Sequence, residues 1–372
     1  MEKIKNIFKK YFTAPEITTA RTNNFNAMRL IASLMVIYGH MAAIMGLPQF
    51  LVLGQKVSSI GVKIFFVLSG YFITKSYLND SNFLRYTIRR VFRIYPAFIT
   101  VVLFSVFVVG GLFTVLPLKE YLTDAGTYSY LKNLLMNVQY GLPGVFIDYT
   151  YPVAVNGSLW SLPVEFSLYF IMPLFVAIFK KLKCLNGGIF ALVLISLGLD
   201  YYVAASPVAL RYVVWGSNLP DCATLVTFFF VGSFMSLPEF KKYFNLQLAT
   251  AILACASLVS LSYAKNEILL VLALPYFVLS FGLAEKPIFG NWFVKNDYSY
   301  GLYLYGFIIQ QVVFNYLKRY SLSLNVMTVI CFAITFVFAF ASWHLIEKPS
   351  QNLSKKLLDK LKNIEQRKKI RT

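Results

Sequence analysis

Long apolar segments separated by short polar stretches run along almost the whole chain. We predict ten transmembrane helices from this pattern, because a helix needs about 20 consecutive apolar residues to cross the hydrocarbon core of a bilayer. The predicted spans are 25–45, 57–78, 93–116, 158–179, 187–206, 220–237, 247–264, 266–283, 297–317 and 325–346. The pattern therefore predicts an all-α, polytopic membrane protein with both termini on the same side.

Basic residues are distributed unequally between the two sides of this predicted bundle. With both termini in the cytoplasm, 26 of the 35 Lys and Arg residues lie on the cytoplasmic side and seven on the opposite side. Cytoplasmic loops of membrane proteins carry such an excess of positive charge. We therefore attribute the net charge of +19 to topology and to contact with anionic lipids, and not to nucleic-acid binding.

The same pattern divides the chain into three parts. We expect a cytoplasmic N-terminal tail at 1–24, a transmembrane domain at 25–346 and a basic cytoplasmic tail at 347–372. The connection at 117–157 is longer than an ordinary loop, and we expect it to fold over the extracytoplasmic face as a lid. The four Cys residues are scattered without metal-ligand spacing, so no metal site is expected.

The first apolar segment contains two ionisable residues, Arg29 and His40. They are eleven residues apart, nearly three helical turns, so both side chains fall on one face about 16 Å apart along the axis. Ionisable side chains in membrane spans usually face the protein interior or a water-filled cavity. The pair therefore indicates a site reached from both sides of the membrane, although a lone His in a helix is more often a hydrogen-bonded interior residue.

A carboxylate lies at a depth that matches His40. Glu165 is about as far from the outer end of the fourth span as His40 is from the outer end of the first, so we expect the two side chains to touch. An imidazole oriented by a carboxylate is a common general base for a hydroxyl group. Lys63, at similar depth, either keeps Glu165 ionised, stabilises a developing oxyanion or snorkels to the outer surface.

An arginine cluster precedes the third predicted span. Arg85, Arg89 and Arg93 form one helical stripe, so we expect three guanidinium groups to converge on a polyanion, with Arg90 beside them and Arg29 near enough to join. The alternative is simple positive-inside anchoring, which Lys would serve as well. A ligand with phosphates here and a reactive end near His40 must be long and thin, as coenzyme A is.

Six motifs together resemble the membrane-bound acyltransferase-3 family of surface-glycan O-acyltransferases. They are Arg29 and His40 with ten residues between them, GVKIFFVLSG at 61–70, RRVFRIYP at 89–96, GSLWSLPVE at 157–165, SYGLYLY at 299–305 and IEKP at 346–349. The motifs follow the order of the family through nearly the whole chain. Each motif alone is weak evidence, whereas six in order on a ten-span background are strong evidence.

The resemblance implies transfer of an acyl group, commonly acetyl, from cytoplasmic acyl-coenzyme A to a hydroxyl of a surface glycan, free or lipid-linked, at the outer face of a bacterial inner membrane. It implies that His40 is catalytic, and that Arg29 and the arginines of 89–93 bind the donor. We also expect Glu165 and Arg29 to assist catalysis. Substrate contacts are expected from four further residues, namely Lys63, Ser69, Trp160 and Tyr303.

Two positions depart from the family pattern. Many relatives have Asp where this chain has Asn26, and some have His after the Tyr-Leu pair near the start of the ninth span, where this chain has Tyr305-Gly306. We expect the geometry of the donor or the acceptor to differ at these positions. The other His, His344, lies near the cytoplasmic end of the last span, and we expect a structural role for it.

Two other functions are compatible with the residues alone. A transporter or flippase of a lipid-linked glycan would also need buried charge and many spans, but the inverted repeats typical of transporters are not visible. An acyltransferase acting on a lipid would carry the same motifs. Direct transfer and an acyl-enzyme on His40, Ser69 or Ser158 are both compatible with the sequence.

Overall fold

The computed structural model describes residues 24–371, apart from 53, 263–266 and 287–295. The predicted N-terminal tail therefore lies outside the described residues, except for Asn24. The fold is all-α, as predicted, and its described strands form two short hairpins, Leu51–Val52 with Gln55–Lys56 (β1, β2) and Val213–Val214 with Ser217–Asn218 (β3, β4). The longer α-helices are α2 (Phe25–Ile44), α3 (Val57–Asn79), α4 (Phe83–Leu103), α8 (Ser161–Lys181), α9 (Leu185–Ala205), α10 (Leu219–Phe234), α11 (Leu246–Ser262), α12 (Glu267–Gly282), α14 (Ser299–Leu317), α15 (Leu324–Ser342) and α16 (Lys348–Arg371).

Every predicted span coincides with a helix, but the helices differ in their capacity to cross a bilayer. Among the described residues, six helices are long and apolar enough, and they are Phe25–Ile44, Val57–Asn79, Phe83–Phe113, Ser161–Lys181, Leu185–Ala205 and Leu324–Gln366. Leu219–Phe234, Leu246–Val259 and Ile268–Gly282 are shorter apolar helices. The count of ten spans and the cytoplasmic position of the termini stay predictions.

The third helix begins ten residues earlier than the predicted span. α4 starts at Phe83, where the Asn82 side chain accepts a hydrogen bond from the backbone N–H of Arg85 (2.9 Å), and it continues through a π-helical stretch, Phe104–Gly110, to Phe113. A helix of this length exceeds the thickness of a bilayer core, about 30 Å. Its first turns, which carry the arginine cluster, therefore extend beyond the apolar part of the helix.

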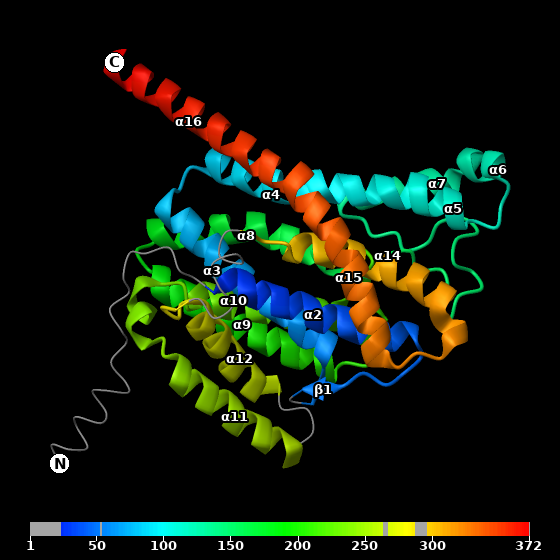
Figure 1. The fold of residues 1–372 in the computed structure, drawn as a ribbon. Coiled ribbons are helices and arrows are strands. Elements are labelled where there is room, and N and C mark those ends of the chain that lie inside the picture. The colour runs from blue at the N-terminus through cyan, green and yellow to red at the C-terminus, as the bar shows by residue number, and fades with distance from the viewer. Residues whose placement is uncertain (1–23, 53, 263–266, 287–295, 372) are drawn as a thin grey trace.

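Two glycines allow α3 and α10 to cross at very close range. A Cβ on Gly70 would lie 1.9 Å from the Phe229 carbonyl oxygen, and a Cβ on Gly232 would lie 2.2 Å from the Val67 carbonyl oxygen. Small residues permit such close backbone packing between apolar helices. The contact fixes α3 in the centre of the bundle, where it also packs against α2 and α8 (Figure 1).

The long connection at 117–157 is structured and packs over one end of the bundle. It contains two short helices, Leu118–Thr123 (α6) and Ala125–Ser129 (α7), and a 3-10 turn, Tyr130–Leu135. Tyr140 donates to the carbonyl of Gly216 in the β3–β4 hairpin (2.6 Å), and Gln311 of α14 donates to the carbonyl of Tyr151 (2.7 Å). This segment therefore packs against the β3–β4 hairpin and α14, and its position on the extracytoplasmic face stays a prediction.

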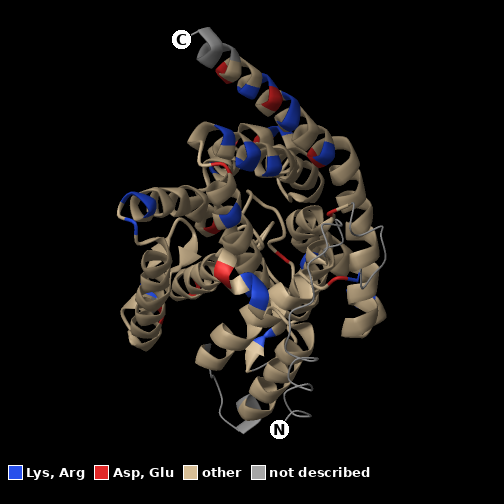
Figure 2. Cartoon of the chain, turned by 90° about the vertical axis from the view of Figure 1, so that its left-hand side faces the viewer, with Lys and Arg blue, Asp and Glu red and all other residues tan. Residues whose placement is uncertain are grey.

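The basic tail is a helix. α15 continues through a π-helical turn, Trp343–Glu347, into α16, so the predicted boundary at 347 falls inside one helical run. α16 lies beside α4 and then extends away from the bundle, and Ser350 donates to the carbonyl of Phe92 (2.9 Å) (Figure 1). Figure 2 shows Lys and Arg concentrated along this helix and the adjacent ends of the bundle, while the bundle interior carries few charges.

Candidate active site

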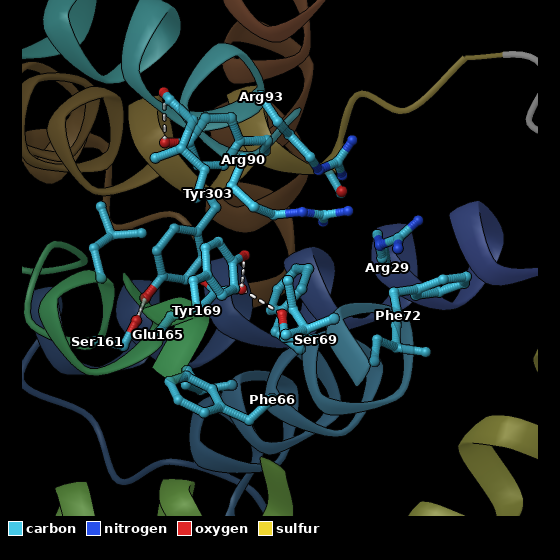
Figure 3. A pocket seen from close by; sticks show the side chains of 18 residues that line it. Arg29, Phe66, Ser69, Phe72, Arg90, Arg93, Ser161, Glu165, Tyr169 and Tyr303 are labelled. Atoms are coloured by element: carbon cyan, nitrogen blue, oxygen red, sulfur yellow. Dashed lines mark hydrogen bonds between the residues drawn. The ribbon is translucent and has the colours of Figure 1, made fainter. Parts of the chain in front are cut away.

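A pocket opens between α2, α3, α4, α8 and α14. Its lining includes Arg29, Ser69, Arg90, Arg93, Glu165 and Tyr303, together with aromatic and aliphatic side chains of α3 and α8. Figure 3 shows the three guanidinium groups on one side of this pocket and the Glu165 carboxylate on the other. Residues far apart in the sequence therefore bring opposite charges to one partly apolar cavity.

One buried carboxylate holds two of the arginines. Asp297 Oδ2 accepts from Arg93 (2.9 Å) and lies 3.5 Å from an Arg29 nitrogen. The Asp297 side chain is only 7% exposed, and its other oxygen accepts from the backbone N–H of Ser299 (3.3 Å) at the start of α14. Arg29 also donates to Asn26 (3.0 Å) and lies over the Phe72 ring at 5.0 Å. Asp297 therefore ties α2 and α4 to the first turn of α14.

Arg90, the third guanidinium of the pocket, has no carboxylate partner within ion-pair distance in the part of the chain that the structure describes. It donates weakly to Ser76 Oγ (3.4 Å) and lies over the Tyr86 ring at 5.7 Å, and its buried Nε atom has no hydrogen-bond partner among the described residues. A buried charge is costly unless it is paired. This arrangement gives the pocket an excess of positive charge that an anionic ligand can neutralise.

The predicted stripe of Arg85, Arg89 and Arg93 does not converge on one ligand, and this prediction is wrong. Arg85 binds both carboxylate oxygens of Asp80 (2.7 and 3.0 Å) and forms an ion pair with Glu365 of α16, while Arg89 donates to Asp80 (3.0 Å). Neither arginine lines the pocket. The physical reason is that Asp80, just before α4, attracts the guanidinium groups on its side of the helix.

Hydrogen bonds from Arg85, and then from Arg89, hold the pKa of the Asp80 carboxyl well below its ordinary value, although partial burial acts in the opposite direction. Asp80 lies in the link between α3 and α4, outside the apolar helices. Its carboxylate is therefore ionised at neutral pH, where it pairs with Arg85 and Arg89 outside the pocket.

Glu165 is oriented by two hydroxyl groups. Its Oε1 atom accepts hydrogen bonds from Ser69 of α3 and from Tyr169 (2.6 Å), one turn along α8. Both dashed bonds are visible in Figure 3. Both donors bind the same oxygen, and the other oxygen, Oε2, has no hydrogen-bond partner among the described residues. The pocket therefore contains a fixed carboxylate with one oxygen available.

Beyond Glu165, a hydroxyl pair lines the pocket. The hydroxyl groups of Ser161 and Tyr303 are 2.6 Å apart, and Tyr303 donates to the carbonyl of Ser158 (2.7 Å). Phe307 lies four residues after Tyr303 on α14 and forms an edge contact with the His40 ring, with centroids 5.3 Å apart. His40 therefore lies about one helical turn beyond Tyr303.

The predicted contact between His40 and Glu165 is not found among the described residues. Glu165 turns toward Ser69 and Tyr169, whereas His40 faces Phe307, and His40 does not line the pocket. Matching depth, on which the prediction rested, does not fix the direction in which a side chain points. The structure thus separates the carboxylate from the imidazole.

The remaining predicted residues lie around this centre. Lys63 is 2% exposed, donates to Gln55 (3.3 Å) and lies over the Phe228 ring, so it does not snorkel to the surface. Trp160 precedes α8, and its carbonyl accepts from Ser217 of β4.

The two positions that depart from the family pattern, and the second His, also have defined surroundings. Asn26 binds Arg29, and Tyr305 packs against Phe104 and Phe338. His344 packs against Tyr298 and Phe340. Packing among aromatic rings fits the structural role expected for His344.

Sequence reasoning missed the two aspartates that organise the arginines. Asp80 lies five residues before Arg85, and this spacing across a helix start was an available signal for a local ion pair. Asp297 contacts Arg29 and Arg93 over more than 200 residues of sequence, so no local pattern could have indicated it.

The sequence profile of an acyltransferase domain family matches residues 22–344. The O-acetyl transferase of Shigella phage Sf6 is 29% identical over 338 residues, which are 88% of this chain and 96% of the phage protein. Nodulation protein 10 of Rhizobium leguminosarum bv. viciae is 28% identical over 49% of this chain and 51% of that protein. Peptidoglycan O-acetyltransferase of Listeria monocytogenes is 36% identical over 39% of this chain and 24% of its own length. No solved structure matches the chain.

Proposed function

Because this chain belongs to the acyltransferase domain family, we propose that it transfers an acetyl group from cytoplasmic acetyl-coenzyme A to a hydroxyl of a cell-surface glycan. Similarity to an O-acetyl transferase and a peptidoglycan O-acetyltransferase supports an O-acetyltransferase that modifies a surface polymer. The bacterial inner membrane is the proposed location, since the proposed donor is cytoplasmic and six helices are suited to span a membrane.

The observation that carries this proposal is the excess of positive charge in the pocket. Three guanidinium groups, those of Arg29, Arg90 and Arg93, face it, and Asp297 is the carboxylate that pairs with two of them. Arginine binds phosphate oxygens through short, charge-assisted hydrogen bonds. We propose that these groups bind the phosphates of the donor nucleotide.

The distance from the arginines to His40 fits a donor with a long arm. Arg29 and His40 are eleven residues apart on the continuous helix α2, about 16 Å along its axis. The arm of coenzyme A would pass from the arginines through the pocket toward Tyr303, Phe307 and His40. The thioester would then reach His40 from one side and the glycan would reach it from the other.

In the proposed reaction, His40 accepts the proton of the glycan hydroxyl while the hydroxyl oxygen attacks the thioester carbonyl carbon. The carbon–sulfur bond breaks, the acetyl ester forms and the coenzyme A thiolate leaves and takes up a proton. The edge contact with Phe307 orients the imidazole for this step. Membership of an acyltransferase family favours this chemistry over the transporter or flippase alternative.

The test is transfer of labelled acetyl from acetyl-coenzyme A to surface glycan in membranes that carry the wild-type chain, His40→Ala or His344→Ala at matched protein levels. The wild type and His344→Ala should transfer label, and His40→Ala should not. Label recovered in lipid instead of glycan would support the lipid acyltransferase alternative. Equal transfer by His40→Ala would overturn the role of His40.

A further inference from the structure

The predicted contact with His40 does not explain where the Glu165 carboxylate lies or which groups surround it. Ser69 and Tyr169 both donate to Oε1, which leaves Oε2 as an acceptor without a hydrogen-bond partner among the described residues. Phe66 and Leu162 line the cavity beside it. A carboxylate oxygen in such surroundings favours a ligand that brings an N–H or O–H donor.

The depth of this carboxylate places it between the arginines and His40. Ser69 lies one turn before Phe72 on α3, and Phe72 is the ring under Arg29, so Ser69 and Glu165 lie about 5 Å beyond the guanidinium level. His40, about 16 Å from Arg29 along α2, lies much deeper. Glu165 is therefore positioned beside the middle of a ligand that joins the two ends.

The chemistry of the proposed donor supplies a matching group at this depth. The arm of coenzyme A carries two secondary amides between its phosphates and its sulfur, and each amide has an N–H donor. An amide N–H that donates to a carboxylate makes a charge-assisted hydrogen bond, the stronger kind. The apolar walls around Glu165 suit the methylene groups between the amides.

We propose that Glu165, oriented by Ser69 and Tyr169, binds an amide N–H of the donor arm and takes no part in proton transfer at His40. This inference rests on the proposed donor. It makes the carboxylate a specificity residue for pantetheine-type thioesters. Ser69 and Tyr169 act as positioning residues, because each holds Glu165 and fixes which oxygen faces the cavity.

The test is titration of the purified full-length protein in lipid nanodiscs with two ligands. One is coenzyme A, and the other is adenosine 3′,5′-bisphosphate, a nucleotide fragment that lacks the arm. Glu165→Gln should weaken coenzyme A binding about tenfold and leave binding of the fragment unchanged. Glu239→Gln is the matched control, because Glu239 is an exposed carboxylate that bonds to Asn186 outside the pocket and should change neither affinity.

Binding of the fragment shows that the Glu165→Gln protein is folded. Tyr169→Phe, which removes one hydrogen-bond donor to Glu165, should lower the affinity for coenzyme A by a few fold and leave the affinity for the fragment unchanged. An equal loss of affinity for both ligands, or no loss of affinity for coenzyme A, would overturn the inference. Wild-type protein that binds neither ligand would overturn the proposed donor itself, which is a different failure. In turnover, Glu165→Gln should raise KM without lowering kcat, and a fall in kcat at saturating donor would contradict the assignment.

Discussion

Two neighbouring arginines of one helix, Arg89 and Arg90, have opposite surroundings. Arg89 donates to Asp80, which also binds Arg85, so this half of the cluster is neutralised outside the pocket. Arg90 faces the pocket and has no carboxylate partner among the described residues. Two adjacent residues of one type thus differ because an aspartate lies on one side of the helix: one is paired with that aspartate and the other faces the pocket.

The most direct test of this difference between Arg89 and Arg90 is to remove each of the two charges separately. Arg90→Gln should raise the KM for acetyl-coenzyme A about 10- to 100-fold, because it deletes a charge-assisted contact to the donor. Arg89→Gln should change KM less than about threefold, since Arg89 binds Asp80 instead. Steady-state kinetics of the two variants at equal protein levels measures the difference, and similar losses in both would refute the division.

Asp297→Asn should have the next largest effect, on stability. Arg29 and Arg93 would lose the carboxylate they share, and removing one partner of a buried ion pair costs a few kcal/mol, here about 1–3 because Arg93 is 32% exposed. Thermal unfolding in detergent should shift to lower temperature. Coenzyme A should raise the unfolding temperature of Asp297→Asn more than that of the wild type, since donor phosphates would replace the lost charge. An unchanged unfolding temperature would show that Asp297 does not hold the two arginines.

Asp80→Asn should be milder. The pairs of Asp80 with Arg85 and Arg89 are partly exposed, and solvent screening makes such pairs contribute little to stability. We expect a small loss of stability with an unchanged KM for acetyl-coenzyme A. Chemical denaturation and donor kinetics on the same sample check both statements, and a large rise in KM would place this half of the cluster in the donor site.

The smallest expected effect is the pH dependence of that stability difference. The pKa of Asp80 is lowered in the folded protein, so its contribution is fully present above the unfolded pKa, about 4, and is lost as the pH falls below that value toward the folded pKa. The wild type and Asp80→Asn should therefore differ in stability at pH 6 and converge as the pH is lowered below 4. A constant difference over that range would mean that the carboxylate charge is not the cause.

The sequence predicted the positions of the helices well, because apolar runs and their polar boundaries are local signals. The third helix began earlier than expected, at Phe83, since the polar face of its first turns lowers the hydropathy there without breaking the helix. The asparagine before it, Asn82, was an available capping signal.

Part of the membership of the pocket was predictable, but its contacts were not, and the predicted residues His40, Lys63, Arg89 and Trp160 do not line it. Arg29, Ser69, Glu165 and Tyr303 do line one pocket, as motif residues of one family would. Helical spacing grouped Arg93 with the wrong neighbours, and matching depth in the membrane paired Glu165 with His40. Side-chain direction is decided by partners from distant segments, such as Asp297, and these become visible only when the chain is folded.

The most direct test of this account is coenzyme A binding by two double variants, Arg90→Gln/Arg93→Gln and Arg85→Gln/Arg89→Gln, in the same nanodisc preparation. Each removes two positive charges from α4, so a general electrostatic effect would weaken binding equally. We predict that the first variant loses measurable binding and that the second retains wild-type affinity within about threefold, less than 1 kcal/mol. Equal losses in the two variants, or retained binding in the first, would contradict the assignment of the donor to the pocket-facing arginines.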